Sequence, residues 1–214
     1  MSNDLQKRFD DGEIIEFDEP TIVLASASPR RARHLEEEGI KFVKILSSVD
    51  DADLNYEHPH EGVSKKQEKE YAKKMALAKL EPFIGRIKNG AVIAADTTVL
   101  CKGRILEKPL TKEMCREQHE LLSGRTNIVY TSIAIYYNGR TYVKTVAYKT
   151  KVKKIPSEVI DEICEDELSY GAAGYRSAGP IAPFLVIKNV ARDGVAGLDP
   201  KVVVKMLRKL GFQI

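Results

Sequence analysis

The chain has 214 residues, of which 43% are hydrophobic and 30% charged. This length and balance suit one sizeable α/β domain with a real hydrophobic core and argue against a disordered chain. The 34 basic residues nearly balance the 31 acidic ones and leave a net charge of +3, so the composition predicts neither a nucleic-acid partner nor a membrane partner. With three scattered cysteines and no apolar run of membrane or signal-peptide type, we expect a cytoplasmic protein whose thiols are small core residues.

The N-terminal part of the chain changes character near residue 20. Residues 1–19 are polar and acid-rich, and we interpret them as a loosely ordered extension that precedes a single domain at 20–214. The apolar run 21–25 predicts a strand, which leads through a short turn into a helix with Ser28 as its N-cap. A second strand is expected at 41–46.

The remaining patterns predict elements that alternate between helix and strand. In chain order they are an amphipathic helix at 65–80, a buried strand at 91–95 that ends at Asp96, a short strand before Pro109, a helix at 111–124, a hairpin over 127–155 with its turn at Asn138-Gly139, a helix from Pro156 to about Cys164, a glycine-rich loop at 170–180, a strand at 181–190 and a C-terminal helix at 199–211. This order predicts a mixed, mostly buried sheet with helices packed around it.

The helix that follows Ser28 carries its charges in the unfavourable direction. Arg30, Arg31 and Arg33 lie at its electropositive N-terminus, where each exposed cation costs about 0.3–1 kcal/mol. Free backbone amides and guanidinium groups at one helix end form an anion site, which would explain the arrangement. The alternative is an ordinary surface in which Arg33 pairs with Glu37 and the other arginines are solvated.

A carboxylate directly after a buried strand is the second chemical feature. Asp96 is placed to hold a divalent metal or to accept a proton from water, although an Asx turn or a helix cap is the commoner role of such an aspartate. Thr97 adds a hydroxyl, while Lys108 and Arg125 offer positive charge to a phosphate. The acidic loop with Asp51 could complete a metal site. Since the chain lacks a motif for a covalent nucleophile, these groups favour attack by water on a phosphoanhydride.

Five segments together resemble the Maf family of nucleoside-triphosphate pyrophosphatases. They read LASASPRR, AADTTVL, ILEKP, LSGRTNIVYT and DELSYGAAGY…AGLDP, and the resemblance runs from about Ile22 to Leu210. It implies a two-lobed α/β fold of the Maf/ITPase-like type, with an elongated mixed β-sheet flanked by helices and a cleft between the lobes. It also implies hydrolysis of a nucleoside triphosphate to the monophosphate and pyrophosphate with Mg²⁺ or Mn²⁺. A homodimer is expected from the family alone.

The resemblance also implies roles for individual residues of this chain. Asp96 would accept a proton or bind the metal, with Asp51 as a second ligand where the family usually has a glutamate. The residues that would neutralise or cradle the triphosphate are Arg30, Arg31, Lys108, Ser28 and the turn at Ser123-Gly124, and Arg125 beyond this turn is a further candidate phosphate contact.

The same resemblance leaves the nucleobase open. Arg30 and Thr97 are similar to the branch that acts on dTTP and UTP, but Ala178 occupies the position of a glutamine that contacts the base. This departure keeps 7-methyl-GTP or another noncanonical nucleotide as an alternative substrate.

Three further departures concern the phosphate site. Met75 and Gly171 each replace a lysine, and Asn127 replaces a histidine, so Lys74 or Arg176 would have to compensate for lost charge. The loss of the two lysines favours a third hypothesis, that the chain is a nucleotide-binding regulatory protein with weak turnover.

Overall fold

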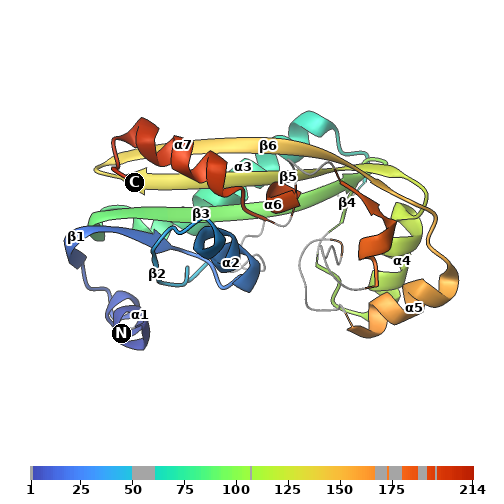
Figure 1. Ribbon diagram of the computed structural model, residues 1–214, viewed down its shortest axis with the longest axis horizontal. Helices are drawn as coiled ribbons and strands as arrows, with labels where there is room; N and C mark the ends of the chain where they lie inside the picture. Colours follow the sequence, from blue (N-terminus) through green and yellow to red (C-terminus); the bar gives the residue numbers. More distant parts are fainter. Residues whose placement is uncertain are drawn as a thin grey trace.

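The protein is a mixed α/β structure built on one long sheet (Figure 1). The computed structural model describes residues 2–49, 61–106, 108–166, 173, 180–187, 192–195 and 197–214. The sheet has seven strands in the order β2-β1-β3-β5-β6-β7, and β4 pairs with β3 outside this path. The expected architecture of a mixed sheet flanked by helices is confirmed.

The strands combine two parallel and several antiparallel pairings. They are β1 (Ile15–Leu24), β2 (Val43–Lys44), β3 (Ile87–Cys101), β4 (Arg104–Leu106), β5 (Thr126–Tyr137), β6 (Arg140–Val152) and β7 (Leu185–Val186). β1 runs parallel to β2 and β3, and all the other pairings are antiparallel. The predicted hairpin turn is confirmed, because Asn138 and Gly139 have φ values of 47° and 73°, the left-handed pair that a two-residue turn needs.

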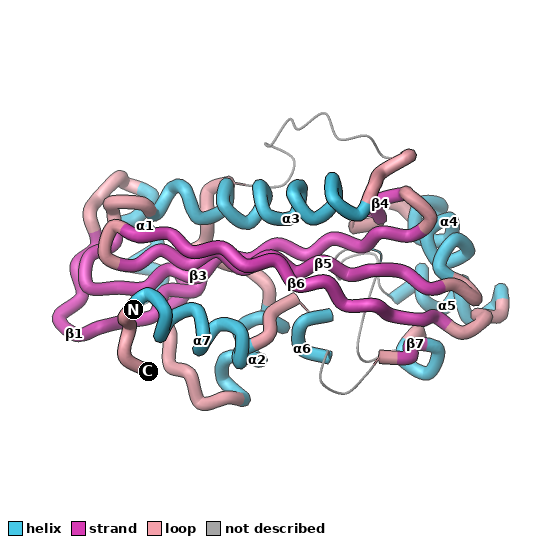
Figure 2. Tube along the Cα trace, turned by 90° about the horizontal axis from the view of Figure 1, so that it is seen from above, coloured by secondary structure: helices cyan, strands magenta, loops and turns pink. Residues whose placement is uncertain are grey.

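Helices cover both faces of the sheet. They are α1 (Ser2–Asp10), α2 (Pro29–Glu37), α3 (Lys65–Leu80), α4 (Lys112–Leu122), α5 (Ser157–Asp166), α6 (Arg192–Val195) and α7 (Pro200–Leu210). α3 lies along one face, and α2, α6 and α7 lie along the other (Figure 2). Local signals fix the ends of these helices: Ser64 and Gln67 form a capping box on α3, and Asp199 caps α7, which ends at left-handed Gly211.

The expectation of a loosely ordered segment at residues 1–19 is wrong. This segment contains α1 and the first half of β1, and Phe9 and Ile15 are each only 1% exposed. The Phe9 ring stacks on Phe83 with the ring centroids 4.5 Å apart. The few apolar side chains among the acidic ones are therefore enough to attach α1 to the core.

The strand expected at 181–190 is also wrong over the described residues. A 3-10 turn at Ala182–Phe184 replaces its first half, and only the two residues of β7 pair with β6. Pro183 explains the difference, because proline cannot donate a hydrogen bond to a neighbouring strand. Residues 188–190 lie outside the described part of the chain. The second predicted strand, at 41–46, is likewise reduced to the two residues of β2.

Two lobes share the three long strands β3, β5 and β6. On one side of β3, the pairing with β1 reaches Ile93, and the pairing with β4 begins at Val99. Between these two residues, the described strands leave that edge of β3 open. One lobe contains α1, α2 and α7, while α4 and α5 pack on the opposite end of the sheet (Figure 1). α3 runs along the sheet across both parts, because Ala76 packs in the core cluster on the β1 side and Ala72 packs with Leu100 and Ile105 on the β4 side. The predicted two-lobed sheet thus arises from an interruption in strand pairing.

The cysteines differ from the expectation of three separate thiols. Cys115 of α4 and Cys164 of α5 form a disulfide, and Cys101 is buried as a free thiol. No local pattern indicates this bond, because the two cysteines have a sequence separation of 49 and only the packing of α4 against α5 brings their Cα atoms to 5.7 Å. Among the described residues, no helix is long and apolar enough to cross a membrane.

Candidate active site

Asp96 lies at the open edge between the two lobes. We expected the strand to end there, but β3 continues to Cys101, and Asp96 pairs with Ser132 of β5 in the middle of the sheet. Strand residues alternate between faces, and Val92 and Ala94 pack in the core cluster that contains Ala76 of α3. Asp96 therefore faces α3, and its side chain is only 9% exposed.

Lys79 of α3 is the charged partner of Asp96. Its Nζ lies 2.6 Å from Asp96 Oδ1, and the lysine side chain is 14% exposed. Met75, which occupies the position of the family's lysine, is buried one helical turn before Lys79. Because helical side chains lean toward the N-terminus, a lysine placed one turn later can still reach the strand. Sequence reasoning missed Lys79, although its i+4 spacing from Met75 was a usable signal.

Arg31 of α2 approaches the same place from the other face of the sheet. Its guanidinium group donates to Thr97 Oγ1 at 3.4 Å and to Ser26 Oγ at 3.1 Å, and its Nε donates to the carbonyl oxygen of Gly197 at 3.1 Å. Thr97 follows Asp96 directly but points to the opposite face. The structure thus brings the predicted Arg31, Thr97 and Asp96 to one short stretch of β3.

Ser28 and Arg30 lie at the beginning of α2. Ser28 is the N-cap residue as predicted, but its side chain makes no capping hydrogen bond, and its own amide donates to Ser26 Oγ at 3.2 Å. Arg30 is half-buried, whereas Arg33 is exposed. The first-turn amides of α2 are therefore left uncapped by Ser28, next to two arginines that are withdrawn in part from solvent.

Lys108 is exposed and follows β4. β4 runs back along β3, with Leu106 opposite Val99, and Glu107, which joins β4 to Lys108, lies outside the described residues. The role of Lys108 as a phosphate contact therefore stays a prediction.

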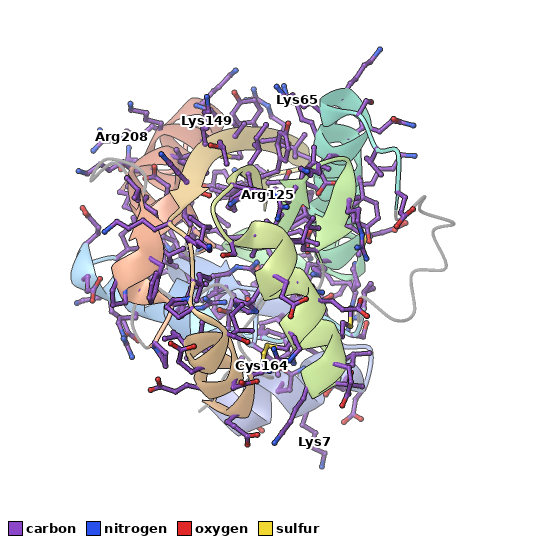
Figure 3. The ribbon with its side chains drawn as sticks, turned by 90° about the vertical axis from the view of Figure 1, so that its right-hand side faces the viewer. Lys7, Lys65, Arg125, Lys149, Cys164 and Arg208 are labelled. Carbon is purple, nitrogen blue, oxygen red and sulfur yellow. A yellow bond between two sulfur atoms is a disulfide. The ribbon has the colours of Figure 1, made fainter. Side chains whose placement is uncertain are left out.

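Two predicted phosphate contacts lie elsewhere. Ser123 Oγ accepts a hydrogen bond from the Ile155 amide, and Arg125 donates to the carbonyl oxygens of Glu120 and Leu121 at the end of α4. Arg125 precedes β5, and six strand residues, about 20 Å, separate Thr126 from the partner of Asp96. Figure 3 looks onto this end of the molecule, where Arg125 is labelled. The structure does not bring these residues to Asp96, because they hold the turn between α4 and β5.

Several predicted positions lie outside the described residues. They are Asp51, Gly171, Arg176 and Ala178. Asn127, which replaces a histidine of the family, is buried in β5 and accepts a hydrogen bond from Thr150 Oγ1. A groove of about 640 Å³ between β1, the turn after α2 and the C-terminal end of α7 contains none of the predicted site residues.

The oxygen atoms near Asp96 suit a hard divalent cation. Thr98 lies two residues further along β3, on the same face as Asp96, and its buried Oγ1 has no hydrogen-bond partner among the described residues. A carboxylate and an unpartnered hydroxyl on the same strand face offer oxygen ligands of the kind that Mg²⁺ and Mn²⁺ prefer, although Asp96 Oδ1 already accepts from Lys79. Mg²⁺ sites often use only one or two carboxylates together with substrate phosphates. The residues present therefore fit the expected metal.

The mixed sheet flanked by helices is that of an α/β protein, and the chain belongs to the Maf family. The family model for Maf-like protein matches residues 21–210. The chain is 33% identical to a dTTP/UTP pyrophosphatase of Syntrophus aciditrophicus, over 89% of this chain and 90% of that protein. It is also 33% identical to a dTTP/UTP pyrophosphatase of Pyrococcus abyssi, over 90% of this chain and 97% of that protein. The protein is thus an enzyme of the class that hydrolyses acid anhydrides.

Proposed function

We propose that the protein is a nucleoside-triphosphate pyrophosphatase that acts on dTTP and UTP or on a modified nucleotide. The observation that carries the proposal is the hydrogen bond from Arg31 to Thr97, next to the buried Asp96–Lys79 pair. This arrangement brings the guanidinium group of Arg31, which suits a polyphosphate, to the same stretch of β3 as the Asp96 carboxylate, which suits activation of water. At this level of β3, neither β1 nor β4 pairs with the strand. The named activity of the relatives supports the same reaction.

The roles follow from the placement of each side chain. Arg30 and Arg31 bind the triphosphate at the beginning of α2, and Lys108 approaches it from the second lobe. Asp96 accepts a proton from the attacking water, while Lys79 orients the carboxylate and balances its charge. Water adds to the α-phosphorus, the α–β phosphoanhydride bond breaks, and pyrophosphate leaves from the nucleoside monophosphate. A divalent cation held by Asp96, with Asp51 as the second proposed ligand, would supply Lewis-acid polarisation of the phosphates.

A panel of nucleoside triphosphates tests this proposal. The purified protein is incubated with dTTP, UTP, 7-methyl-GTP and the common nucleotides in the presence of Mg²⁺ or Mn²⁺, and monophosphate and pyrophosphate are measured. We expect equimolar release of both products and fastest turnover with a pyrimidine. Faster turnover of 7-methyl-GTP would select the alternative substrate, and tight binding without turnover would identify a regulatory protein. Release of orthophosphate alone would contradict cleavage between the α- and β-phosphates.

A cytoplasmic location and a homodimeric state are part of the proposal. The proposed substrates are small nucleotides. The relatives from Syntrophus aciditrophicus and Pyrococcus abyssi, which align over nearly their whole length, are named as pyrophosphatases of dTTP and UTP. Cell fractionation tests the first statement. Size-exclusion chromatography with light scattering tests the second, since a dimer would elute with twice the mass of 23.9 kDa.

A further inference from the structure

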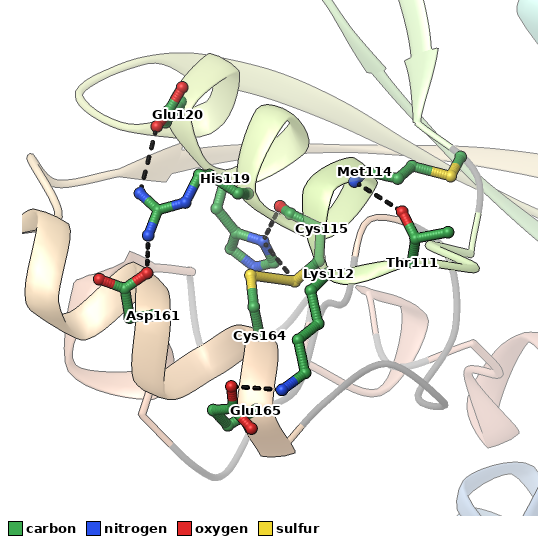
Figure 4. The surroundings of a disulfide bond; sticks show 10 residues. Thr111, Lys112, Met114, Cys115, His119, Glu120, Asp161, Cys164 and Glu165 are labelled. Carbon is green, nitrogen blue, oxygen red and sulfur yellow. Dashed lines mark hydrogen bonds and ion pairs between the residues drawn. A yellow bond between two sulfur atoms is a disulfide. The ribbon is translucent and has the colours of Figure 1, made fainter.

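A second cluster of chemically active side chains lies in the other lobe, between α4 and α5 (Figure 4). It consists of Cys115 and His119 from α4 and Cys164 from α5. Their exposed fractions are 0%, 0% and 4%, and one ligand atom from each lies within 4.8 Å of the other two. Residues four apart on a helix share a face, so Cys115 and His119 point together toward Cys164. None of these residues belongs to the group around Asp96.

The imidazole of His119 has the arrangement of a metal ligand. Its Nδ1 lies 2.8 Å from the carbonyl oxygen of Cys115, which accepts a hydrogen bond from that nitrogen in the matching tautomer, and the same Nδ1 lies 3.5 Å from Cys115 Sγ, so this edge of the ring faces the sulfur atoms. Metal-binding histidines usually donate one ring nitrogen to a carbonyl or carboxylate in this way, and the other nitrogen then carries the lone pair. Here Nε2 is buried and has no hydrogen-bond partner among the described residues. Burial also lowers the pKa of His119, which favours the neutral imidazole that binds metals.

We propose that Cys115, His119 and Cys164 form a redox-gated site for a thiophilic divalent cation such as Zn²⁺. A dithiol reductant breaks the Cys115–Cys164 bond in a two-electron step, becomes a disulfide itself and leaves two protein thiols. The cation then replaces both thiol protons, and the three protein ligands leave its fourth position to water. The reverse exchange closes the site: a small-molecule disulfide takes up the two electrons and becomes a dithiol, the two cysteine sulfurs form their bond again, and the cation is released. Soft sulfur and imidazole donors distinguish it from the oxygen-rich surroundings of Asp96.

The surrounding contacts keep the ligands together after reduction. Lys112 pairs with Glu165 and Arg116 with Asp161, so two ion pairs join α4 to α5 beside the sulfur atoms (Figure 4). Apolar side chains of α5 pack in the same core cluster as both cysteines. Two sulfurs bound to a tetrahedral zinc ion lie about 3.8 Å apart, from Zn–S bonds of about 2.3 Å. Small side-chain rotations provide this separation without displacing the helices.

Cobalt(II) tests the site because its thiolate complexes absorb visible and near-ultraviolet light. The full-length protein is reduced with a phosphine under anaerobic conditions and titrated with Co²⁺ alone, and then with Zn²⁺ as competitor. We expect charge-transfer and d–d bands that saturate at one equivalent in the reduced protein, are absent in the oxidised protein and disappear on addition of Zn²⁺. The reduced form should expose three thiols to a thiol reagent under denaturing conditions, and the oxidised form one.

Matched variants locate the binding. Cys101→Ser removes the free buried cysteine and should leave the bands unchanged, whereas Cys115→Ser and Cys164→Ser should remove the thiolate bands at one equivalent. His119→Gln should weaken Co²⁺ binding about tenfold or more and keeps the site testable if a cysteine variant fails to fold, as judged by circular dichroism. The proposal is overturned if the reduced protein shows no thiolate bands, or if Cys115→Ser and His119→Gln bind Co²⁺ as the unmodified protein does.

Discussion

Breaking the Lys79–Asp96 ion pair tests the centre of the proposed active site. The Nζ–Oδ1 distance is 2.6 Å, and the two side chains are 14% and 9% exposed, so the pair is nearer to a buried than to a surface ion pair. Removing one partner of a fully buried pair costs about 3–5 kcal/mol, and an exposed pair contributes about 0–1 kcal/mol. For Lys79→Met or Asp96→Asn alone, we therefore expect the free energy of unfolding to fall by about 2–3 kcal/mol.

A variant with both Lys79→Met and Asp96→Asn separates the interaction energy of the ion pair from the other effects of each substitution. With both charges removed, no unpaired charge is left behind, so the loss should be smaller than the sum of the two single losses by about 2 kcal/mol. Urea unfolding of the four proteins measures this coupling. Lys73→Met is the matched control on the same helix, because Lys73 is 41% exposed and should change stability by less than about 0.5 kcal/mol. Additive losses for Lys79 and Asp96 would refute the argument.

Activity distinguishes a positioning role from a purely structural one. Lys79→Met should lower kcat by roughly tenfold to a hundredfold with a smaller change in KM, because it removes the group that orients Asp96 rather than a group that binds phosphate. Lys79→Arg should restore part of the turnover, since it keeps the charge. Asp96→Asn should abolish pyrophosphate release in a protein that still folds. Equal turnover in all these variants would remove both residues from the mechanism.

Three other predictions address other parts of the molecule. Arg31→Lys keeps the charge but loses the forked guanidinium, so steady-state kinetics should show KM for the triphosphate rising about tenfold, and an unchanged KM would argue against phosphate binding there. Phe9→Ala should lower the urea midpoint and cost about 3 kcal/mol, because the ring is buried against Phe83; a loss below about 1 kcal/mol would mean that α1 contributes little to the core. Burial, and then the nearby Glu68 charge, raise the pKa of Tyr130 from its usual value near 10, so the unfolded chain ionises first and stability should fall as the pH rises above 10. Tyr130→Phe should flatten that fall in urea titrations between pH 9 and 11, and an identical slope would exclude Tyr130 as its source.

Local signals in the sequence predicted much of the fold. α3 begins where predicted because Ser64 and Gln67 form a capping box, and the Asn138-Gly139 turn sets the register of the long hairpin. The order of segment 1–19 was missed because it depends on contacts with a distant part of the chain, namely the stacking of Phe9 on Phe83 and the pairing of Ile15 with Ile87. Within the described residues 181–187, Pro183 was the local signal against a full strand.

The candidate site was predicted only in part, because local motifs identify some of its residues and tertiary packing determines the others. Arg31 and Asp96 came from local motifs, and the parallel pairing of β1 with β3 brings them near one another. Lys79 was missed because the helix was compared with the family only at Met75; the i+4 spacing placed Lys79 on the same helix face, but only the packing of α3 on the sheet shows that it reaches Asp96. Ser123 and Arg125 matched a motif, but Ser123 Oγ accepts from the Ile155 amide after β6, and the Arg125 guanidinium group donates back to carbonyl oxygens at the end of α4.

The open edge of β3 between Ile93 and Val99 has a mechanical consequence. At that level the described sheet is only three strands wide, whereas β1 and β4 widen it on either side. Resistance to bending grows with the number of hydrogen-bonded strands, so the waist of the molecule is where it flexes most easily. Asp96 lies at this waist, with Arg31 attached to one half and β4 to the other. A bending motion of one half of the sheet against the other therefore changes the distance between Asp96, the proposed proton acceptor, and the cations that would bind the polyphosphate.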